Sequence, residues 1–375
     1  MLKKLLPYFL ILLYLIYMGQ TYIPALKLLS SVSALLLVAI SCYYFVRTWL
    51  INERHNMFIK SLTCLFVLFL IGFATSNDMN IATNMLKMFI LVNFIFFPIY
   101  YLTRKRIIDI RFLEFTIWLF TAFFIFDYFS FKDHLIMERI ADVDDVVNNA
   151  GYNLVCLIPG LLFMKKKYFM PLIMILSLLV VESAKRGAII TLFMGLIYIF
   201  IVYKRIYGIN KLSILSKIAL TVIPVVVLLL VWNYMSSNEY IMERFSSLGE
   251  GDSSGRDVLL VTCWNSFWEN IGLGSLFFGY GLGATVNLAG NFAHNDWMET
   301  LVNLGFLGIF SLIAYYGGIF KEYRRINDIH KYILLLCLMM LFVRTVFSMS
   351  FADPSSFPLI IICAYIMGMH RKQLY

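Results

Sequence analysis

The feature that most constrains this chain is a succession of apolar runs that extends over nearly its whole length. A helix of about 20 apolar residues is long enough to cross the hydrocarbon core of a bilayer. Runs of about that length give twelve candidate spans: 5–20, 23–46, 57–75, 85–103, 112–131, 150–164, 168–184, 187–203, 214–234, 297–320, 332–350 and 357–369. The weakest members of this set are the two short runs, 150–164 and 357–369.

Composition excludes the other broad classes of protein. Hydrophobic residues make up 61% of the 375 residues and charged residues 14%, against about 45–50% and about 25% in soluble domains. A soluble core could not bury that much apolar surface, and a disordered chain would be far less apolar. We therefore expect an all-α polytopic membrane protein with about 12 transmembrane helices, organised as one membrane domain over residues 1–375.

The positions of Lys and Arg predict the orientation of the chain, because these residues collect in cytoplasmic loops. With the N-terminus placed in the cytoplasm, 22 of the 31 Lys and Arg residues fall in inside segments, so we expect both termini to be cytoplasmic. The net charge of +9 follows from these loops and does not favour a nucleic-acid partner. Lys3 and Lys4 precede the first apolar run, but no small-residue cleavage site follows, so we expect this run to stay as the first helix.

Cysteine and carboxylate spacing does not indicate a metal centre. The six cysteines are scattered and form no CxxC pair, so we expect neither a disulfide framework nor a zinc site. Acidic residues gather in the predicted outer loop 132–149, where Asp142, Asp144 and Asp145 are interpreted as solvating the loop. We therefore expect no metal and no cofactor.

Residues 235–296 form the one long polar segment, on the outer face in the predicted topology. Loops of this length usually have a function. Apolar residues, including Trp264 and Trp268, recur at helical spacing over 256–271, which predicts an amphipathic helix. This helix lies either at the membrane interface or on the transmembrane core. The glycines over 272–283 lack the preceding strand that a dinucleotide site requires and are interpreted as tight turns.

Four cationic or titratable side chains fall on the predicted outer side. Arg186 joins the seventh and eighth spans, Arg256 begins the amphipathic segment, His294 precedes the tenth span and Arg344 lies inside the eleventh. Ionisable residues within a membrane are costly and are candidates for function, and arginine binds phosphate through two parallel hydrogen bonds. Together these residues favour an anionic ligand that lies partly in the lipid, and a lipid pyrophosphate fits that description.

Structural interpretations of the same residues remain open. Arg186 could pair with Glu182, and Arg344 could pair with Asp353 or with Glu299.

The residues around His294 also have a structural explanation. A lone histidine is usually structural, and His294 is followed by Asn295 and Asp296 at the start of a span. Asn or Asp at this position can cap the first turn of the helix.

Several of these segments resemble one known group of proteins. Residues 294–308, with His-Asn, nine residues, Gly, two residues and Gly, resemble the signature of the O-antigen ligase and O-antigen polymerase superfamily. Residues 183–187 (SAKRG) are similar to its Ser-Arg-Gly segment, with Ala and Lys inserted between the serine and the arginine. The Ser-Gly-Arg of 254–256 and the Phe-Gly-Tyr-Gly of 278–281 resemble its large outer loop. Arg344 resembles an arginine in a late span of some members.

The resemblance implies a metal-independent glycosyltransferase with the helical membrane fold called GT-C, acting at the outer face of a bacterial inner membrane. Its substrates would be oligosaccharides carried on undecaprenyl pyrophosphate. A polymerase transfers the growing glycan to the next lipid-linked repeat unit and so builds O-antigen or capsule-type polysaccharide. The implied partners are the lipid-linked donor and acceptor and membrane lipids, with a chain-length regulator and a flippase as further candidates.

If a glycan is transferred from a pyrophosphate, each of these candidate residues has an expected role. Developing negative charge on the leaving group requires cations that are already in place, and the attacking sugar hydroxyl is helped by a base. His294 is either that base or a group that orients a phosphate or hydroxyl. We expect three catalytic residues: Arg186, Arg256 and His294. We expect substrate contacts from four others: Lys185, Asn295, Asp296 and Arg344.

Two alternative functions remain. An O-antigen ligase would transfer the finished glycan to lipid A-core, and the Ser-Gly-Arg segment at 254–256 favours the polymerase over it by a small margin. A flippase for the same lipid-linked sugars is a weaker alternative. A transporter would place charges at the midplane and often contains an internal repeat, whereas here most charges fall on the predicted outer face and no repeat is visible.

Overall fold

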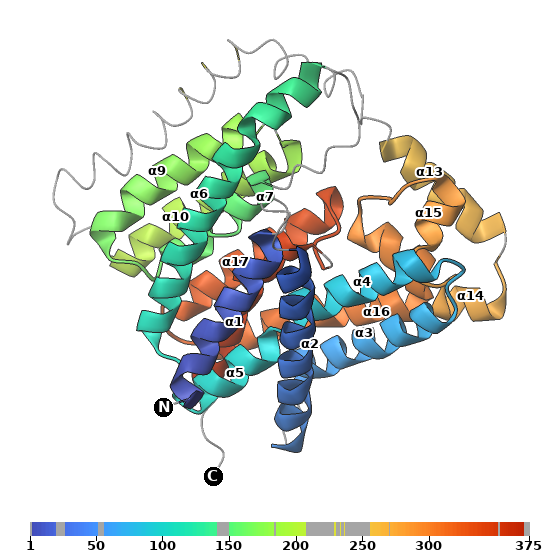
Figure 1. The fold of residues 1–375 in the computed structure, drawn as a ribbon, viewed down its shortest axis with the longest axis horizontal. Coiled ribbons are helices and arrows are strands. Elements are labelled where there is room, and N and C mark those ends of the chain that lie inside the picture. Colours follow the sequence, from blue (N-terminus) through green and yellow to red (C-terminus); the bar gives the residue numbers. More distant parts are fainter. Residues whose placement is uncertain are drawn as a thin grey trace.

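A computed structural model describes most of the chain: residues 2–19, 27–51, 56–140, 150–183, 185–207, 256–269, 271–351 and 353–370, with isolated positions at 229, 233 and 236. Within these residues every regular element is a helix (Figure 1). Six helical stretches are long and apolar enough to cross a membrane: Lys27–Leu50, Met57–Ala74, Met79–Arg104, Ile110–Ser130, Asp296–Arg325 and His330–Phe347. The expectation of an all-α polytopic membrane protein is confirmed, and the count of twelve spans stays a prediction.

Most of the predicted spans correspond to helices. The first half of the chain forms α1 (Leu2–Gly19), α2 (Lys27–Leu50), α3 (Met57–Ala74), α4 (Met79–Asn93), α5 (Phe96–Arg104), α6 (Ile110–Ile140), α7 (Ala150–Val155), α8 (Ile158–Leu161), α9 (Lys166–Glu182) and α10 (Arg186–Tyr207). The second half forms α13 (Arg256–Glu269), α14 (Leu273–Phe278), α15 (Ala284–Ala289), α16 (Asp296–Arg325), α17 (His330–Phe347) and α18 (Phe357–His370), with a short 3₁₀ helix, η4 (Pro354–Ser356), before α18. The predicted ninth span, 214–234, lies outside the described residues apart from the isolated positions.

The clearest differences from the predicted boundaries are at two places. The span predicted over 85–103 belongs to the longer stretch Met79–Arg104, which is interrupted between α4 and α5, where Pro98 has no N–H to give to the carbonyl of Phe94. Helix α6 continues to Ile140, into the segment predicted as loop 132–149, because neither glycine nor proline interrupts residues 110–140. Asp142, Asp144 and Asp145 lie outside the described residues.

The two short apolar runs form helices that are enclosed by protein. Every residue of α7 and α8 is buried, and so are residues 357–368 of α18. Helix α18 packs against α5, α17 and α8. A helix that is apolar on all sides belongs either in lipid or in a protein core, and here the neighbouring helices surround it.

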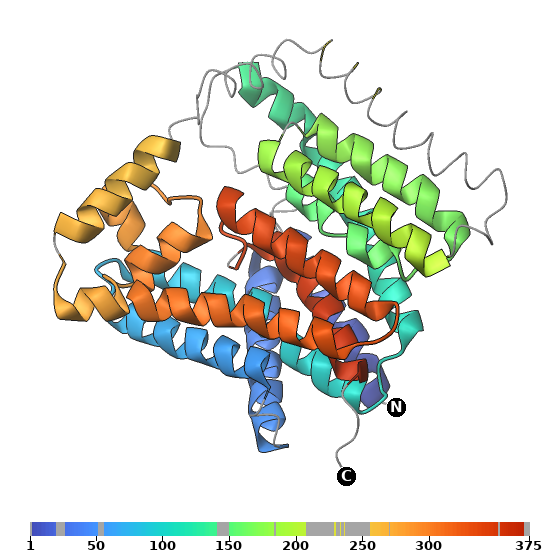
Figure 2. The same ribbon diagram turned by 180° about the vertical axis from the view of Figure 1, so that it is seen from behind.

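Helix α17 lies between two groups of helices. It contacts α10 on one side and α16 on the other, and α16 packs along α3. Figures 1 and 2 show α3, α4 and α16 side by side with α13, α14 and α15 at one end, while α6, α9 and α10 lie on the other side of the molecule. The ends of α17 therefore meet residues from distant parts of the sequence.

The predicted amphipathic helix is present as α13. Its Cys263 and Phe267 are buried against α15 and α16 in a second apolar cluster. Its Trp264 and Trp268 are 48% and 40% exposed. One face is thus packed on the core, and the exposed aromatic face is of the kind found at a membrane interface.

Candidate functional site

The C-terminal end of α17 collects side chains from three other segments. The carbonyl of Phe347 accepts hydrogen bonds from Arg256 Nη1 at 3.3 Å and from the Tyr152 hydroxyl at 3.4 Å. The preceding carbonyl, of Val346, accepts one from the side-chain amide of Asn295 at 3.4 Å. The last carbonyls of a helix have no partner within it. The end of α17 therefore joins α7, the first residue of α13 and the N-cap of α16.

Close packing brings the first turn of α10 to the same place. A Cβ on Gly187 would clash with the Tyr152 hydroxyl and would lie 2.7 Å from the Cβ of Phe347. Only glycine fits here, so its presence after Arg186 lets α10 approach the end of α17. Lys185 and Arg186 are both partly buried beside this contact.

His294 completes the group. Burial lowers the pKa of its imidazole from the usual 6.5, and the positive charges of Arg256 and Lys185 lower this pKa further. Lys185 also lies beside Tyr152, because a Cβ on the preceding Gly151 would be 3.3 Å from the Cβ of Lys185. A histidine with a lowered pKa is neutral at neutral pH and can accept a proton. We call Tyr152, Lys185, Arg256, His294 and Asn295 the α17-end cluster.

The backbone around His294 is held in an unusual conformation. His294 has a φ of 50°, in the left-handed region that residues other than glycine seldom adopt. Asn295 caps α16, because its side-chain oxygen accepts the N–H groups of Trp297 at 3.0 Å and Met298 at 3.1 Å. The expectation that an Asn or Asp caps this helix is therefore confirmed for Asn295.

A buried glutamate fixes the loop that precedes His294. Glu299 is completely buried and accepts hydrogen bonds from the Ala293 N–H and from the Thr285 hydroxyl, the latter at 2.8 Å. It also accepts one from the Asn303 side chain at 3.0 Å. Because Ala293 directly precedes His294, the bond to its N–H holds the backbone next to His294 in place. Glu299 is a positioning residue that the sequence offered only as an ion-pair partner of Arg344.

Asp296 is enclosed instead of facing the α17-end cluster. Its carboxylate has no exposed surface and accepts hydrogen bonds from the N–H of Ser350, at 3.1 Å, and from the Ser350 hydroxyl. It thereby ties the start of α16 to the segment that follows α17. These surroundings favour a positioning role, and direct contact with sugar stays a prediction.

Arg344 is also fully enclosed, one turn before the end of α17. Its guanidinium pairs with Asp353 at 3.0 Å and donates to Ser355 at 2.6 Å and Ser356 at 2.8 Å. It also donates to the sulfur of Cys156 and lies over the ring of Tyr152, 4.7 Å from its centroid. The ion pair with Asp353, one of the structural alternatives, is therefore present. Arg344 touches Tyr152 of the α17-end cluster, whereas its contact with substrate stays a prediction.

The glycines of the resemblance have structural explanations. Gly279, Gly281 and Gly283 have φ values of 74°, 94° and 82°, which confirms tight turns in this segment. Gly305 interrupts α16 with a φ of 65°, and a Cβ there would lie 2.5 Å from the carbonyl carbon of Phe277. The loop can approach α16 this closely because these residues have no side chains, and α16 in turn carries Asn295.

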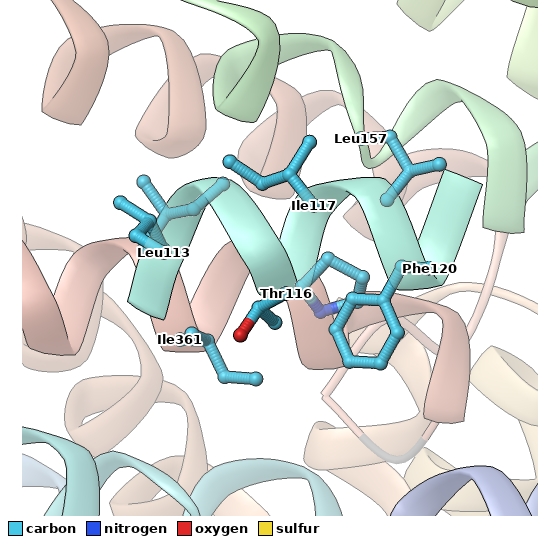
Figure 3. A pocket seen from close by; sticks show the side chains of 8 residues that line it. Leu113, Thr116, Ile117, Phe120, Leu157 and Ile361 are labelled. Atoms are coloured by element: carbon cyan, nitrogen blue, oxygen red, sulfur yellow. The ribbon is translucent and has the colours of Figure 1, made fainter. Parts of the chain in front are cut away.

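An apolar pocket lies away from this cluster (Figure 3). It lies between α6 and α18 and is lined by Leu113, Thr116, Ile117, Phe120, Leu157, Pro358, Ile361 and Ile362. Thr116 is its one polar side chain, so nothing in it would recognise an anion. The α17-end cluster is the better candidate for chemistry.

The structure brings several of the predicted site residues close together, and their roles stay predictions. Lys185, Arg256, His294 and Asn295 come together although they are separated by up to 110 positions. Tyr152 was missed, because a tyrosine in an apolar run has no distinguishing pattern. The fold and the cluster thus define a multi-pass membrane protein with a cationic, histidine-containing site where four segments meet.

Comparison with known proteins finds a family that part of the chain resembles. Residues 171–313 match the model of a family described as O-Antigen ligase. The matched range contains Lys185, Arg256, His294 and Asn295, and it confirms the resemblance to the O-antigen polymerase and ligase superfamily. No curated protein matches the chain.

Proposed function

We propose that this protein is a metal-independent membrane glycosyltransferase that polymerises oligosaccharide repeat units carried on undecaprenyl pyrophosphate into O-antigen or capsule-type polysaccharide. The observation that supports it best is the proximity of Lys185 and Arg256 to a His294 whose pKa they lower. Cations beside a neutral base are what glycosyl transfer from a lipid pyrophosphate requires.

In this proposal the α17-end cluster binds the donor through its pyrophosphate. Lys185, Arg186 and Arg256 offset the charge that develops on the leaving group. Arginine suits this role because its planar donors match two phosphate oxygens at once. Asn295 and Tyr152 hold the end of α17 in place beside the ligand.

The transfer step then follows from the position of His294. The acceptor hydroxyl attacks the anomeric carbon of the donor glycan, and the bond from that carbon to the pyrophosphate oxygen breaks. The proton of the hydroxyl passes to the imidazole, and undecaprenyl pyrophosphate leaves with the electron pair of the broken bond. Holding both substrates in one site removes most of the entropic cost of their encounter.

The proposed setting is a bacterial inner membrane, with about twelve spans in a GT-C-like arrangement and both termini in the cytoplasm. The α17-end cluster then faces the outside. The exposed Trp264 and Trp268 of α13 support an outer interfacial position for the loop 235–296, because amphipathic tryptophans favour the headgroup region.

The direct test is a transfer assay with the full chain purified in detergent. A synthetic undecaprenyl-pyrophosphate repeat unit is supplied without nucleotide or metal, and the products are resolved by gel. A ladder of glycan lengths is expected from the wild type and from Asn291→Ala, an exposed position in the same loop. His294→Ala should abolish the ladder, and Arg256→Gln should leave only a small residual activity.

The ligase has specific support from the description of the matched family, and the same assay distinguishes it. Transfer that occurs only after lipid A-core is added would assign the ligase. Inertness in both reactions, together with movement of the lipid-linked sugar across liposomes, would overturn the transferase and assign the flippase.

A further inference from the structure

A second cluster of polar side chains lies at the opposite end of α17 from the candidate site. Asp328 precedes α17, His330 is its first residue and His370 is the last residue of α18. Asp328 Oδ2 lies 2.9 Å from His330 Nδ1 and 3.2 Å from His370 Nε2, and the two ring nitrogens lie 3.2 Å apart. Three potential metal-ligand atoms therefore converge from two helices.

These separations match a tetrahedral metal site. Zinc binds histidine nitrogen and carboxylate oxygen at about 2.0–2.2 Å, and a tetrahedron with such bonds has edges of about 3.3 Å. The three distances of 2.9, 3.2 and 3.2 Å are close to that edge. An ion could be bound by all three atoms with only small movements of the side chains.

Hydrogen bonds alone satisfy the three atoms less well. If both rings donate to Asp328 Oδ2, two N–H groups face each other across 3.2 Å. If one ring instead donates its N–H to the nitrogen of the other ring, that N–H no longer donates to Asp328. The carboxylate oxygen then accepts a hydrogen bond from one ring only. One cation bound by both nitrogens and the oxygen removes this conflict.

The surrounding residues hold the ligands in place and leave them accessible. The other carboxylate oxygen of Asp328 accepts the backbone N–H of His330 at 2.9 Å, and the His330 ring stacks on Phe163. Such outer contacts orient metal ligands. The side chains of Asp328, His330 and His370 are 45%, 20% and 26% exposed, so an ion and a water molecule as fourth ligand could reach the site.

We propose that Asp328, His330 and His370 bind one divalent transition-metal ion of the zinc type. Two imidazole nitrogens and one carboxylate favour such an ion over magnesium or calcium, which prefer oxygen ligands. The ion joins the start of α17 to the end of α18. The 18 residues of α17 separate the ion from the α17-end cluster by about 27 Å at about 1.5 Å per residue, so the ion joins helices and takes no part in the transfer step.

The test uses the full chain purified without a polyhistidine tag and stripped with a chelator. Cobalt(II), a spectroscopic substitute for zinc, should bind one equivalent and give the visible absorption of a tetrahedral site, and zinc should displace it. Zinc should also raise the thermal midpoint of the protein, because it binds only the folded state. His370→Ala and the near-isosteric Asp328→Asn should each weaken binding at least tenfold.

The matched control is His294→Ala, which removes a histidine outside the cluster and should bind the metal as the wild type does. Size-exclusion elution identifies any variant that fails to fold, and Asp328→Asn is chosen because it preserves shape. Absence of a bound equivalent in the wild type would overturn the proposal, and so would equal affinity in wild type, His370→Ala and Asp328→Asn. These outcomes do not depend on whether the chain transfers sugar.

Discussion

At the scale of single residues, the chemistry of the site depends on what surrounds His294. Its imidazole is partly buried, and Arg256 and Lys185 lower its pKa in addition to the burial. Each of these causes disfavours the protonated ring. The cations that would stabilise a leaving pyrophosphate therefore also keep the adjacent histidine in the form that accepts a proton.

This arrangement predicts a pH profile. With His294 as the base, transfer should fall as the pH drops through the lowered pKa, so the midpoint of the acid limb should lie below 6.5 in the wild type. In Arg256→Gln the midpoint of the residual activity should move upward, because a charge that disfavours protonation has been removed. Rates measured from pH 4.5 to 8 would show this. An acid limb that is unchanged in Arg256→Gln would contradict the role of His294 as base.

Arg344 gives a prediction about stability. Replacing it with Gln leaves the Asp353 carboxylate without its 3.0 Å ion-pair partner in a buried position. Removing one member of a buried pair costs about 3–5 kcal/mol, so the thermal midpoint in detergent should fall strongly. Restoring neutrality with Arg344→Gln and Asp353→Asn together should recover part of the loss. A double variant as unstable as the sum of both single variants would show that the pair is not coupled.

At the level of the helices, glycines allow residues 277–279 to approach α16 closely. The kink at Gly305 requires a φ of 65° and has no room for a Cβ beside Phe277 and Gly279. Gly317, in the same helix, has the flexible end of Met57 as its nearest neighbour, at 3.4 Å. The two glycines therefore have different functions in the fold.

Alanine substitution at these two positions should give opposite results. Gly305→Ala should destabilise the protein by about 1–3 kcal/mol through backbone strain alone and should lower transfer activity by displacing His294. Gly317→Ala should be neutral or slightly stabilising, because alanine favours a helix. Thermal midpoints and rates of both variants check this. Equal behaviour of the two would contradict the account of the kink.

Hydropathy predicts where helices lie, because a bilayer requires apolar runs of fixed length, and α2, α3 and α16 follow the prediction closely. Hydropathy does not predict which apolar helices face lipid and which face protein, so the enclosed α18 falls among the predicted spans, as one of the two weakest. Sequence motifs single out Arg256 and His294 as candidate site residues. Tyr152, and the pair of His330 and His370 forty positions apart, depend on packing that no local pattern encodes.

At the scale of the whole molecule, the account requires the two ends of α17 to lie on opposite sides of the membrane. In the proposed orientation, the α17-end cluster and the helices α13 to α15 lie on the outer side, and the loop from α16 to α17 lies on the cytoplasmic side. The Lys and Arg residues at the end of α16 fit that assignment.

Cysteine labelling tests this orientation. A membrane-impermeant maleimide added to intact spheroplasts should label Leu273→Cys, at a position that is 80% exposed. It should leave Lys321→Cys unlabelled until the membrane is permeabilised. The unsubstituted chain provides the background from the native cysteines. Labelling of Lys321→Cys in intact spheroplasts would reverse the proposed orientation.

The measurement that tests the central claim most directly is binding of undecaprenyl pyrophosphate to the purified chain in detergent. The account predicts that Arg256→Gln weakens binding at least tenfold, since a hydrogen bond to a charged group contributes about 1.5–3 kcal/mol. Arg324→Gln, which removes an exposed arginine at the far end of α16, should bind as the wild type does. Equal affinities in all three proteins would contradict the assignment of the α17-end cluster as the pyrophosphate site.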